Sequence, residues 1–453
     1  MTTNDVHDLL EQACDQIPDT DLADAAWAVA YGRQVRRRRV LVALAAACSV
    51  ATAGAVVASD FSAPVTQGHA LTNSPSVTSP AGPTSPSTPA TGSPQDAAVL
   101  ARVWSLPDPG DMTGLPWSTS GPVQGEVDLV RSARPFSTSG GFRAGERIDA
   151  AFAMPTAKKA GIVTSLGNIY LLDELTLRDT SDSSGNAHFH LSPSAISPDG
   201  TMLAIAQPNG VVLIDPTRGA EAKPWHTIPI ANPTIESANF VDGGRTILAG
   251  SDGGLYVVDV ASGTSIKRPS RFGADEIVLS GGANSGGPVE VRTWDATKRA
   301  YGPAVAVTDP RIGDVWGMGG SNLPGTGFVA GLVSPTQSTL DALWRARGLN
   351  SYQGIAAVPL GGGEAALLLD VSQPGTDDAS IAQSRSKAGI RPVGTTSEEN
   401  LLILADGGYA KTTKGDFTLV RQDLVSWNIR TGELARVAAL TGEWVGLILR
   451  PGV

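Results

Sequence analysis

Cysteine is nearly absent from this sequence, and basic residues form a dense cluster at only one place. Cys14 and Cys48 are the only cysteines among 453 residues, so no disulfide can form within the C-terminal part, residues 96–453. A hydrophobic core must stabilise that part, and its length permits one. The net charge is -10, and the one basic cluster is Arg36–Arg39. This charge balance argues against a nucleic-acid partner.

Sequence motifs of reactive sites are missing as well. Neither the nucleophile elbow, Gly-x-Ser-x-Gly, nor the phosphate-binding loop, Gly-x-x-x-x-Gly-Lys-Ser/Thr, occurs in the chain. Residues 179–185 resemble a calcium loop, but they lack its Asp-x-Asp-x-Asn-Gly spacing and its closing glutamate.

Histidine offers one arrangement that could bind a metal ion. His188 and His190 are the only close pair, and alternation along a strand would place both on one face. No cysteine or third histidine is nearby, so we expect no metal site. We also expect no catalytic or cofactor-binding residues, and therefore a protein that is not an enzyme.

An uncharged apolar run, residues 40–58, directly follows the arginine cluster. Its length is what a helix needs to cross about 30 Å of hydrocarbon. Positive charge beside a span stays on the cytoplasmic side. We therefore predict one transmembrane helix over residues 40–58, in the cell membrane, with residues 1–39 in the cytoplasm and everything after Ser59 outside.

Three other interpretations of this run are open. A cleaved signal peptide could end at Val57-Ala58-Ser59, although the 39 residues before the run are too many for an ordinary signal. Lipidation at Cys48 would require a lipobox, and Ala45 occupies the position where a large aliphatic residue is usual. The run could also be a buried helix of a soluble domain, but the arginine cluster argues against this.

The head, residues 1–39, is acidic until it reaches the arginine cluster. Residues 1–32 carry seven carboxylates and no Lys or Arg. Apolar residues recur at spacings of three and four on both sides of Pro18, which predicts two short amphipathic helices. Such helices are marginal in water. The head is therefore either a segment that folds when it docks on a partner or a solvated tail that only sets topology.

Residues 59–95 have the composition of a disordered stalk. From Phe61 to Gln95 there is no charged side chain, and prolines alternate with Ser, Thr, Ala and Gly. Such a segment cannot bury enough apolar surface to fold. We expect a semi-extended stalk that holds the outer domain away from the bilayer.

From Asp96 onward the chain has the pattern of an all-β domain. Short apolar runs are separated by Gly, Asp, Asn and Pro turns, which is typical of strands. Long helical periodicity is nearly absent, and Gln337–Gly348 is the best candidate for a helix.

The strands recur in a common unit. Residues 195–219 and 238–263 share one plan: strand, Asp-Gly turn, strand, Gly turn, strand, then a turn that starts at Asp and ends in Gly. The equivalent positions in successive units are Asp173, Asp215, Asp259, Asp295 and Asn428. We expect the side chains of Asp215 and Asp259 to bind turn backbone rather than to carry chemistry. Asp199-Gly200 and Asp242-Gly243 should be hairpin turns with positive φ.

A repeat of about 40 residues with about four strands per unit predicts a β-propeller over residues 96–453. Six units are recognisable, and a seventh could come from residues 97–104 or 125–130. The predicted fold is therefore all-β, a six- to seven-bladed propeller preceded by the helical head and the transmembrane helix. The last strand, Trp444–Leu449, should pair with an N-terminal strand, because an open ring would leave sheet edges unpaired.

Parts of the outer domain resemble WD-repeat-like propellers. The Ser197–Gly200 turn and the pairs Trp294-Asp295 and Trp427-Asn428 have the form of turns in that family. The Gly-His dipeptide of strict WD repeats is absent from residues 96–453, so the intracellular scaffold subfamily is not implied.

The head also has a resemblance. The run Asp19–Trp27, followed by the arginine cluster and the span, resembles the N-termini of actinobacterial single-pass membrane proteins. Some of those are encoded beside alternative sigma factors, so the resemblance implies a link to a cytoplasmic regulator. Cys14 stands alone, without the His-x-x-x-Cys-x-x-Cys pattern of zinc-type anti-sigma domains, which argues against a direct anti-sigma role.

Together these features predict a membrane-anchored, extracytoplasmic binding module that acts as a sensor or scaffold through its loops. Its expected partners are a protein or polymer ligand outside the cytoplasm and a regulator at the head; no cofactor is expected. One alternative is an extracytoplasmic hydrolase or lyase that acts on cell-wall polymers at the propeller channel. Clustered carboxylates with His188 or His190 there would favour it, whereas apolar and amide groups would exclude it. The other alternative is a purely structural envelope protein.

Overall fold

The computed structural model describes residues 93–452 of the chain, except for 109–110, 139–140, 155–156, 182–186, 189–190, 219–222, 233, 253, 269, 271–273, 283–286, 317–322, 325–326, 373–389 and 412–416. All described residues belong to one compact unit, Thr88–Val453. The predicted head (1–39), transmembrane helix (40–58) and nearly all of the stalk lie outside them. In the described part of the chain, no helix has the length and apolarity to cross a bilayer.

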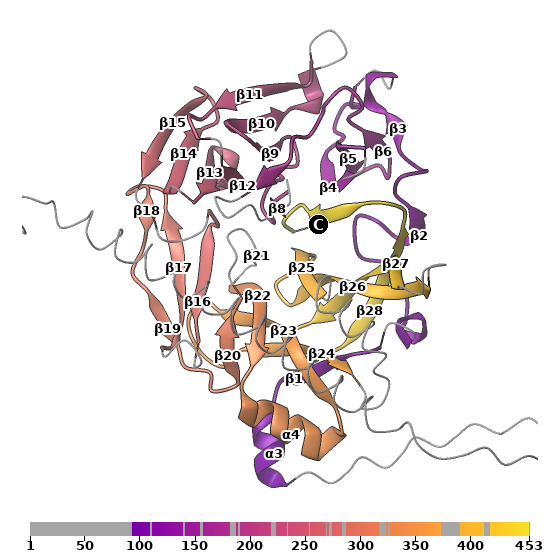
Figure 1. The fold of residues 1–453 in the computed structure, drawn as a ribbon, viewed down its shortest axis with the longest axis vertical. Helices are drawn as coiled ribbons and strands as arrows, with labels where there is room; N and C mark the ends of the chain where they lie inside the picture. Colours follow the sequence, from indigo (N-terminus) through magenta and orange to yellow (C-terminus); the bar gives the residue numbers. More distant parts are fainter. Residues whose placement is uncertain are drawn as a thin grey trace, which may run out of the picture. The chain divides into compact units, whose positions relative to one another are not determined.

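The described unit consists mainly of β-sheets, which Figure 1 shows in a ring around a centre. Three sheets form the first half of the ring. The first contains β29 (Val445–Leu449), β4 (Ile148–Met154), β5 (Lys159–Thr164), β6 (Ile169–Leu171) and β3 (Arg134–Pro135). The second contains β9 (Leu203–Gln207), β10 (Gly210–Ile214) and β11 (Trp225–Pro229), and the third contains β12 (Ile235–Val241), β13 (Thr246–Ser251), β14 (Gly254–Asp259) and β15 (Thr264–Arg268).

The second half of the ring contains three more sheets. The first contains β16 (Ile277–Gly281), β17 (Val289–Asp295), β18 (Ala300–Tyr301) and β19 (Val305–Val307). The second contains β20 (Ile312–Val315), β21 (Leu323–Pro324), β22 (Phe328–Pro335), β23 (Asn350–Pro359), β24 (Ala366–Ser372) and β1 (Val103–Leu106). The third contains β25 (Ile390–Thr395), β26 (Asn400–Lys411), β27 (Phe417–Asn428), β28 (Leu434–Thr441) and β2 (Gly125–Asp128). A separate pair consists of β7 (Thr180–Ser181) and β8 (Ala187–His188).

The all-β propeller fold is confirmed, but the predicted number of six to seven blades is wrong. Within the described residues, five sheets have the four or more strands of a complete blade, and the β9–β11 sheet has three. The expected inner strand of that sheet is reduced to a single bridge between Ile196 and Leu203. Pro193 and Pro198 flank this bridge and lack the N–H groups that a longer ladder would require.

The hydrophobic core lies between neighbouring sheets. For example, one cluster joins Ala204 and Leu213 of the β9–β11 sheet to Phe240 and Ile247 of the β12–β15 sheet. Another joins Leu404 and Leu424 of the β25–β28 sheet to Phe152 of β4. Because each sheet buries both faces against its neighbours, the ring is stable only when every sheet has a neighbour on both sides.

The ring is closed by the end of the chain, as the sequence predicts. β29 pairs antiparallel with β4, with Ile448 opposite Ala151 and Leu449 opposite Ala150. The sheet at this closure, which we call the seam, therefore combines the last strand, β29, with four strands from the N-terminal part, β3 to β6. This pairing covers the inner edge of β4, which would otherwise be open at the centre.

The turns at the ends of the repeats also match the prediction. The Asp215 carboxylate accepts a hydrogen bond from the Thr217 N–H at 3.1 Å, and the Asp259 carboxylate accepts one from the Ser262 N–H at 2.8 Å. Asp295 and Asn428 bind turn backbone in the same way. Asp173 is different, because it accepts from the N–H of Ser137, 36 residues away. The predicted hairpin glycines have positive φ, 72° at Gly200 and 64° at Gly243.

Residues 94–138, which we call the strap, follow the outer edges of three consecutive sheets. β1 pairs in parallel with β24, β2 with β28, and β3 with β6. The N-terminal segments that could have supplied a seventh blade are therefore extra strands on existing sheets. The strap also contains the short helices α3 (Pro94–Val99), η1 (Asp111–Gly114) and η2 (Phe136–Thr138).

The strap begins at a capped helix that is bound to a second helix. Ser93 and Asp96 form a reciprocal capping box at the start of α3, so this helix includes two residues of the predicted stalk. The Asp96 carboxylate also accepts a 2.7 Å hydrogen bond from Arg345 of α4 (Gln337–Arg347). α4 is the helix that the sequence predicts over residues 337–348. In Figure 1 both helices lie together at the outer side of the β20–β24 sheet.

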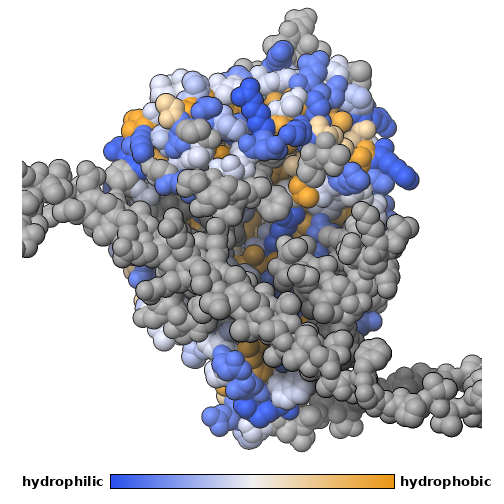
Figure 2. All heavy atoms as spheres, in the orientation of Figure 1, coloured by the Kyte–Doolittle hydropathy of each residue, from blue (hydrophilic) through white to orange (hydrophobic). Residues whose placement is uncertain are grey.

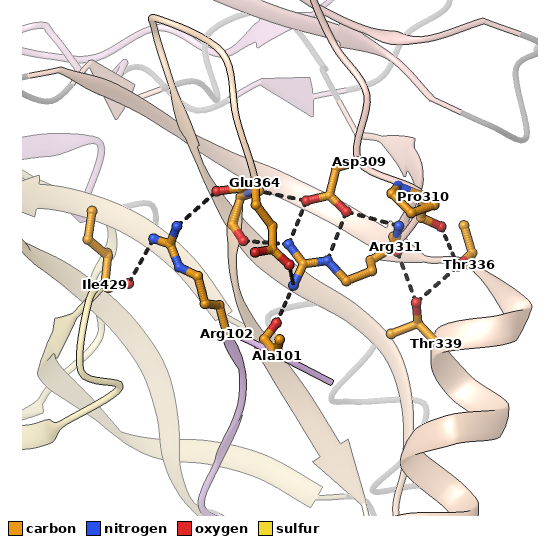
Figure 3. A network of polar contacts seen from close by, with 10 residues as sticks. Ala101, Arg102, Asp309, Pro310, Arg311, Thr336, Thr339, Glu364 and Ile429 are labelled. Carbon is orange, nitrogen blue, oxygen red and sulfur yellow. Dashed lines mark hydrogen bonds and ion pairs between the residues drawn. The ribbon is translucent and has the colours of Figure 1, made fainter. Parts of the chain in front are cut away.

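A buried ionic network fixes the strap to the β20–β24 sheet (Figure 3). Arg311 binds Asp309 through two hydrogen bonds, from Nε at 2.8 Å and from Nη2 at 2.6 Å, and both side chains are almost fully buried. The same guanidinium donates to the carbonyl of Ala101 in the strap and to the carbonyl of Ala365 next to β24. Burial alone would raise the pKa of Asp309, but the hydrogen bonds and the charge of Arg311 lower it.

An aromatic contact holds the middle of β1. Trp104 packs edge-on against Trp427, with ring centroids 5.9 Å apart. Gly432 lies directly under the indole of Trp104, and a Cβ at this glycine would lie 1.7 Å from Nε1. Gly263 occupies the equivalent turn of another repeat, also with positive φ, but a Cβ there would meet nothing within 4 Å.

Gly432→Ala is expected to destabilise the protein more than Gly263→Ala does. Both changes place a side chain at positive φ, which costs about 1–2 kcal/mol. Only Gly432→Ala also forces Trp104 away, and overpacking of this kind adds about 1–3 kcal/mol. Denaturant unfolding of the two variants measures the difference. Equal losses of stability in the two variants would show that the strap does not pack on the turn that contains Gly432.

Asp309→Ala is expected to lower the free energy of unfolding at neutral pH by about 3–5 kcal/mol, because it removes the buried partner of Arg311 and leaves only the half-exposed Glu364 to pair with this guanidinium. Glu399→Ala, which breaks an exposed ion pair with Arg430, should cost no more than about 1 kcal/mol. The pKa of Asp309 is lower when folded than its ordinary value of 3.8, so the wild type loses this stabilisation as the pH falls below 3.8. The difference in free energy of unfolding between the wild type and Asp309→Ala should therefore become smaller in acid. Urea unfolding at several pH values measures this difference.

The central channel as candidate functional site

A cavity of about 290 Å³ lies where the inner ends of the sheets meet. The lining residues come from all around the ring: Ser194, Ile196, Pro198, Phe240, Glu276, Pro324, Thr395, Pro451 and Gly452. Figure 2 shows both hydrophobic and hydrophilic residues near the middle of this face. The cavity is therefore the central channel of the propeller, the place where propellers present residues of several blades to one ligand.

A buried asparagine connects three of the inner segments around the channel. The Asn239 side chain accepts a hydrogen bond from the Ser194 N–H at 2.9 Å and donates to the Ala274 carbonyl at 3.0 Å. The Phe240 N–H donates to the Ser194 carbonyl at 2.8 Å. Because Asn239 is fully buried, these bonds fix the spacing of the inner segments on which Ser194, Phe240 and Glu276 stand.

The C-terminal segment completes the lining on the opposite side. Arg450 follows β29 and binds Asp149 through its Nε at 3.0 Å, while its Nη1 donates to the Pro198 carbonyl at 3.3 Å. These bonds position Pro451 and Gly452 beside the residues that precede β9. Ring closure and channel formation are thus the same structural event.

Glu276 is the one carboxylate among the described residues that line this cavity. It precedes β16 and is half-buried. Burial raises the pKa of Glu276, and the negative charge of Asp242 raises it further. Among the described residues, the Glu276 carboxylate forms no hydrogen bond and no ion pair. Burial therefore removes solvent from the charge of this carboxylate, and no protein group in the described part of the chain compensates for the loss. Such an arrangement is unusual unless a bound ligand or a proton neutralises the charge.

The other lining residues are mainly apolar. Phe240 and Ile196 are buried, three prolines contribute ring carbons, and the remaining polar side chains are the hydroxyls of Ser194 and Thr395. Such walls bind and orient a ligand, but they offer little for acid–base chemistry, which in polymer hydrolysis uses two carboxylates.

The structure does not test the position of the predicted histidine pair. His188 lies in the short strand β8, and His190 lies outside the described residues. In the suspected calcium loop, Asp179 instead forms an exposed ion pair of 2.8 Å with Lys158, and residues 182–185 are outside the described part. Within that part, no group of three or more His, Cys, Asp and Glu residues is arranged to hold a metal ion.

A second cavity, of about 370 Å³, lies where the strap meets the seam of the ring, and its lining consists of Asp128, Val130, Arg131, Met154, Ala157, Gly442 and Glu443. Its strap carboxylate is already used, because Asp128 accepts hydrogen bonds from the N–H groups of Val130 and Arg131 at 3.1 and 2.9 Å. This cavity therefore resembles a packing gap beside a turn more than a ligand site.

Glu276 could not have been selected from the sequence. It stands in an ordinary position before an apolar strand, with Asp275 beside it, and no motif marks it. What distinguishes it is the ring geometry, which directs the start of β16 into the channel. The only sequence signal is a charged residue at the beginning of an inner strand, and this signal is weak, because such residues usually face solvent.

Comparisons with known proteins add little to this site. A scan of protein-family models finds no match, and no curated protein matches the sequence. Solved structures that match part of this chain include TolB from Acinetobacter baumannii, with 14% sequence identity and a TM-score of 0.37. The match covers 67% of this chain and 66% of the TolB chain. The WD40 repeats of RRP9 match with 12% identity and a TM-score of 0.34, over 67% of this chain and 86% of that one. The hydrazine synthase of Kuenenia stuttgartiensis matches with 10% identity and a TM-score of 0.31, over 56% of this chain and 69% of that one.

The chain thus spans slightly less than two thirds of the TolB chain. TM-scores this low support no conclusion about activity or partners. The assignment of the propeller fold rests on the sheets themselves.

Glu276→Gln is expected to stabilise the protein at neutral pH and to leave it nearly unchanged in acid. The pKa of Glu276 is higher in the folded state, so the folded protein binds more protons than the unfolded chain between pH 4.5 and the folded pKa. Stability therefore falls as the pH rises through this window, and the glutamine variant lacks that loss.

The measurement is urea unfolding at pH 3.5–4 and at pH 7, with the exposed Glu433→Gln as control. The control should follow the wild type at both pH values. A Glu276→Gln variant that is no more stable than wild type at pH 7 would contradict the description of this carboxylate.

Proposed function

We propose that this protein is a membrane-anchored propeller that binds a ligand or a partner protein at its central channel, outside the cytoplasm. The supporting observation is the channel itself, where residues from all around the ring form one mainly apolar cavity with a single desolvated carboxylate. Apolar walls with a few placed polar groups are typical of binding sites. The protein acts as a binding module, a sensor or a scaffold, rather than as an enzyme.

The membrane anchor in this proposal is the apolar run at residues 40–58, with the arginine cluster on the cytoplasmic side. The stalk then leads directly into the strap, whose first helix is capped by Ser93. Because the strap is hydrogen-bonded to three sheets, the stalk is joined to the ring through three short parallel pairings. This connection suits a module that is held away from the bilayer at a fixed face.

The acidic head supplies the second contact in the proposal. Its amphipathic pattern and its resemblance to actinobacterial single-pass membrane proteins support docking on a cytoplasmic regulator. Binding outside the membrane would then be coupled to regulation inside it through one transmembrane helix.

The hydrolase or lyase alternative has weaker support. Its one favourable feature is the raised pKa of Glu276, which suits a general acid. Polymer hydrolysis of this kind uses a pair of carboxylates that flank the bond, and the described lining of the channel offers one. A binding role requires no second carboxylate.

Blocking the channel is expected to remove outer partners, and deleting the head is expected to remove inner ones. Gly452 lines the cavity, and a Cβ added there would meet nothing within 4 Å, so we expect the indole of Gly452→Trp to occupy the channel without disturbing the core. Gly263→Trp is the matched control, because this glycine also has positive φ and open space but lies on an outer turn.

The measurement is quantitative co-purification from native membranes of the wild type, Gly452→Trp, Gly263→Trp and a chain lacking residues 1–32. Gly452→Trp should lose extracytoplasmic partners and keep the cytoplasmic regulator, and the truncated chain should do the reverse. If neither Gly452→Trp nor the truncation changes what is recovered, the proposed function is wrong.

A further inference from the structure

We propose that the channel recognises a protonated primary amine on an apolar stem, with Glu276 as the counter-ion. This inference rests on the proposed function and names the ligand chemistry of the same site. The ammonium group could belong to a lysine side chain of a partner protein or to a free alkylamine, and both present the same head group.

The charge of the cavity is the first reason. The Glu276 carboxylate faces a cavity, is half-buried and is without a hydrogen bond or ion pair among the described residues. The nearby charge on Asp242 is also negative, so the potential at the channel favours cations. A cationic ligand would compensate the charge that burial leaves without solvent.

The kind of cation follows from the number of available acceptors. Calcium takes six to eight oxygen ligands, and magnesium requires an octahedral set, usually completed by water, whereas this lining offers one carboxylate. An ammonium group has three donors, and the lining contains three suitable acceptor groups: the carboxylate of Glu276 and the hydroxyls of Ser194 and Thr395. A guanidinium has five donors in a rigid fork and would leave donors unpaired here.

The walls fit the rest of the ligand. Phe240 and Ile196 are apolar, and the rings of Pro198, Pro324 and Pro451 complete an apolar surface. An alkyl stem gains free energy when it leaves water for such walls. An ammonium group over the face of a Phe ring is additionally attracted to the π electrons. The volume of about 290 Å³ suits a stem with one head group rather than a large ligand.

The test is binding of n-butylamine to the purified full-length protein in detergent, measured by calorimetry, with n-butanol as a neutral ligand of the same shape. The wild type should bind butylamine at least about tenfold more tightly than butanol, since a charged hydrogen bond contributes about ten- to hundredfold. Glu276→Gln should remove this preference, and Glu433→Gln should keep it. Thermal unfolding of both variants confirms that they are folded.

A second arm separates the two sources of the amine. A lysine peptide with blocked termini that binds more tightly than butylamine, and competes with it, assigns the site to a partner protein. Tighter binding of butylamine assigns it to a free alkylamine. Either result supports the inference, provided that Glu276→Gln weakens the binding.

The inference is overturned if butanol binds as tightly as butylamine, if Glu276→Gln binds butylamine like the wild type, or if butylamine does not bind. The proposed function is tested separately by Gly452→Trp. If Gly452→Trp loses its outer partners but the wild type does not bind butylamine, the channel is a binding site for a ligand other than an amine. Retention of all partners would reject the channel itself.

Discussion

The structure depends on one strand pairing, that of β29 with β4. The sheets of the ring bury both faces against their neighbours, so an unclosed ring would expose two apolar faces and two inner edges. The last strand of the chain removes this cost by completing the sheet that the N-terminal part begins. The same segment then continues through Arg450 into the lining of the channel, where Pro451 and Gly452 face Phe240 and Glu276. Folding and the formation of the binding cavity are therefore linked through a few residues at the C-terminus.

The strap reinforces this closure from the outside. Its three short strands bind in parallel to the two sheets before the seam and to the sheet at the seam. Short parallel pairings are weak on their own. Here they are supported by the Arg311–Asp309 pair and by the Trp104 contact, both of which join the strap to residues more than 200 positions away. A buried ion pair contributes little net stability. The Arg311 guanidinium nevertheless ties the strap to the sheet, because it donates to the carbonyls of both Ala101 and Ala365.

Much of the ring could be predicted from the sequence because it is encoded locally. Asp215 and Asp259 mark equivalent turns, Gly200 and Gly243 mark hairpins, and Gln337–Gly348 has a helical period that the structure confirms as α4. Ring closure could be predicted because edges are costly. The number of complete blades was wrong, since the weak inner strand at Ile196 and the parallel strands of the strap depend on contacts that leave no periodic pattern. Glu276 belongs to the same class: its importance comes from what the ring places around it. The single span, the stalk and the head remain predictions from composition and charge.

The most direct test of the central claim, that the C-terminal strand closes the ring and thereby forms the channel, is amide hydrogen exchange of the full-length protein. If the account is correct, the amides of β29, such as Ile448 and Leu449, are protected as strongly as those of Ala150 and Ala151 in β4, and both strands exchange together. Rapid exchange across β29, while the ladder between β4 and β5 stays protected, would contradict it, because the ring would then be open at its seam in solution.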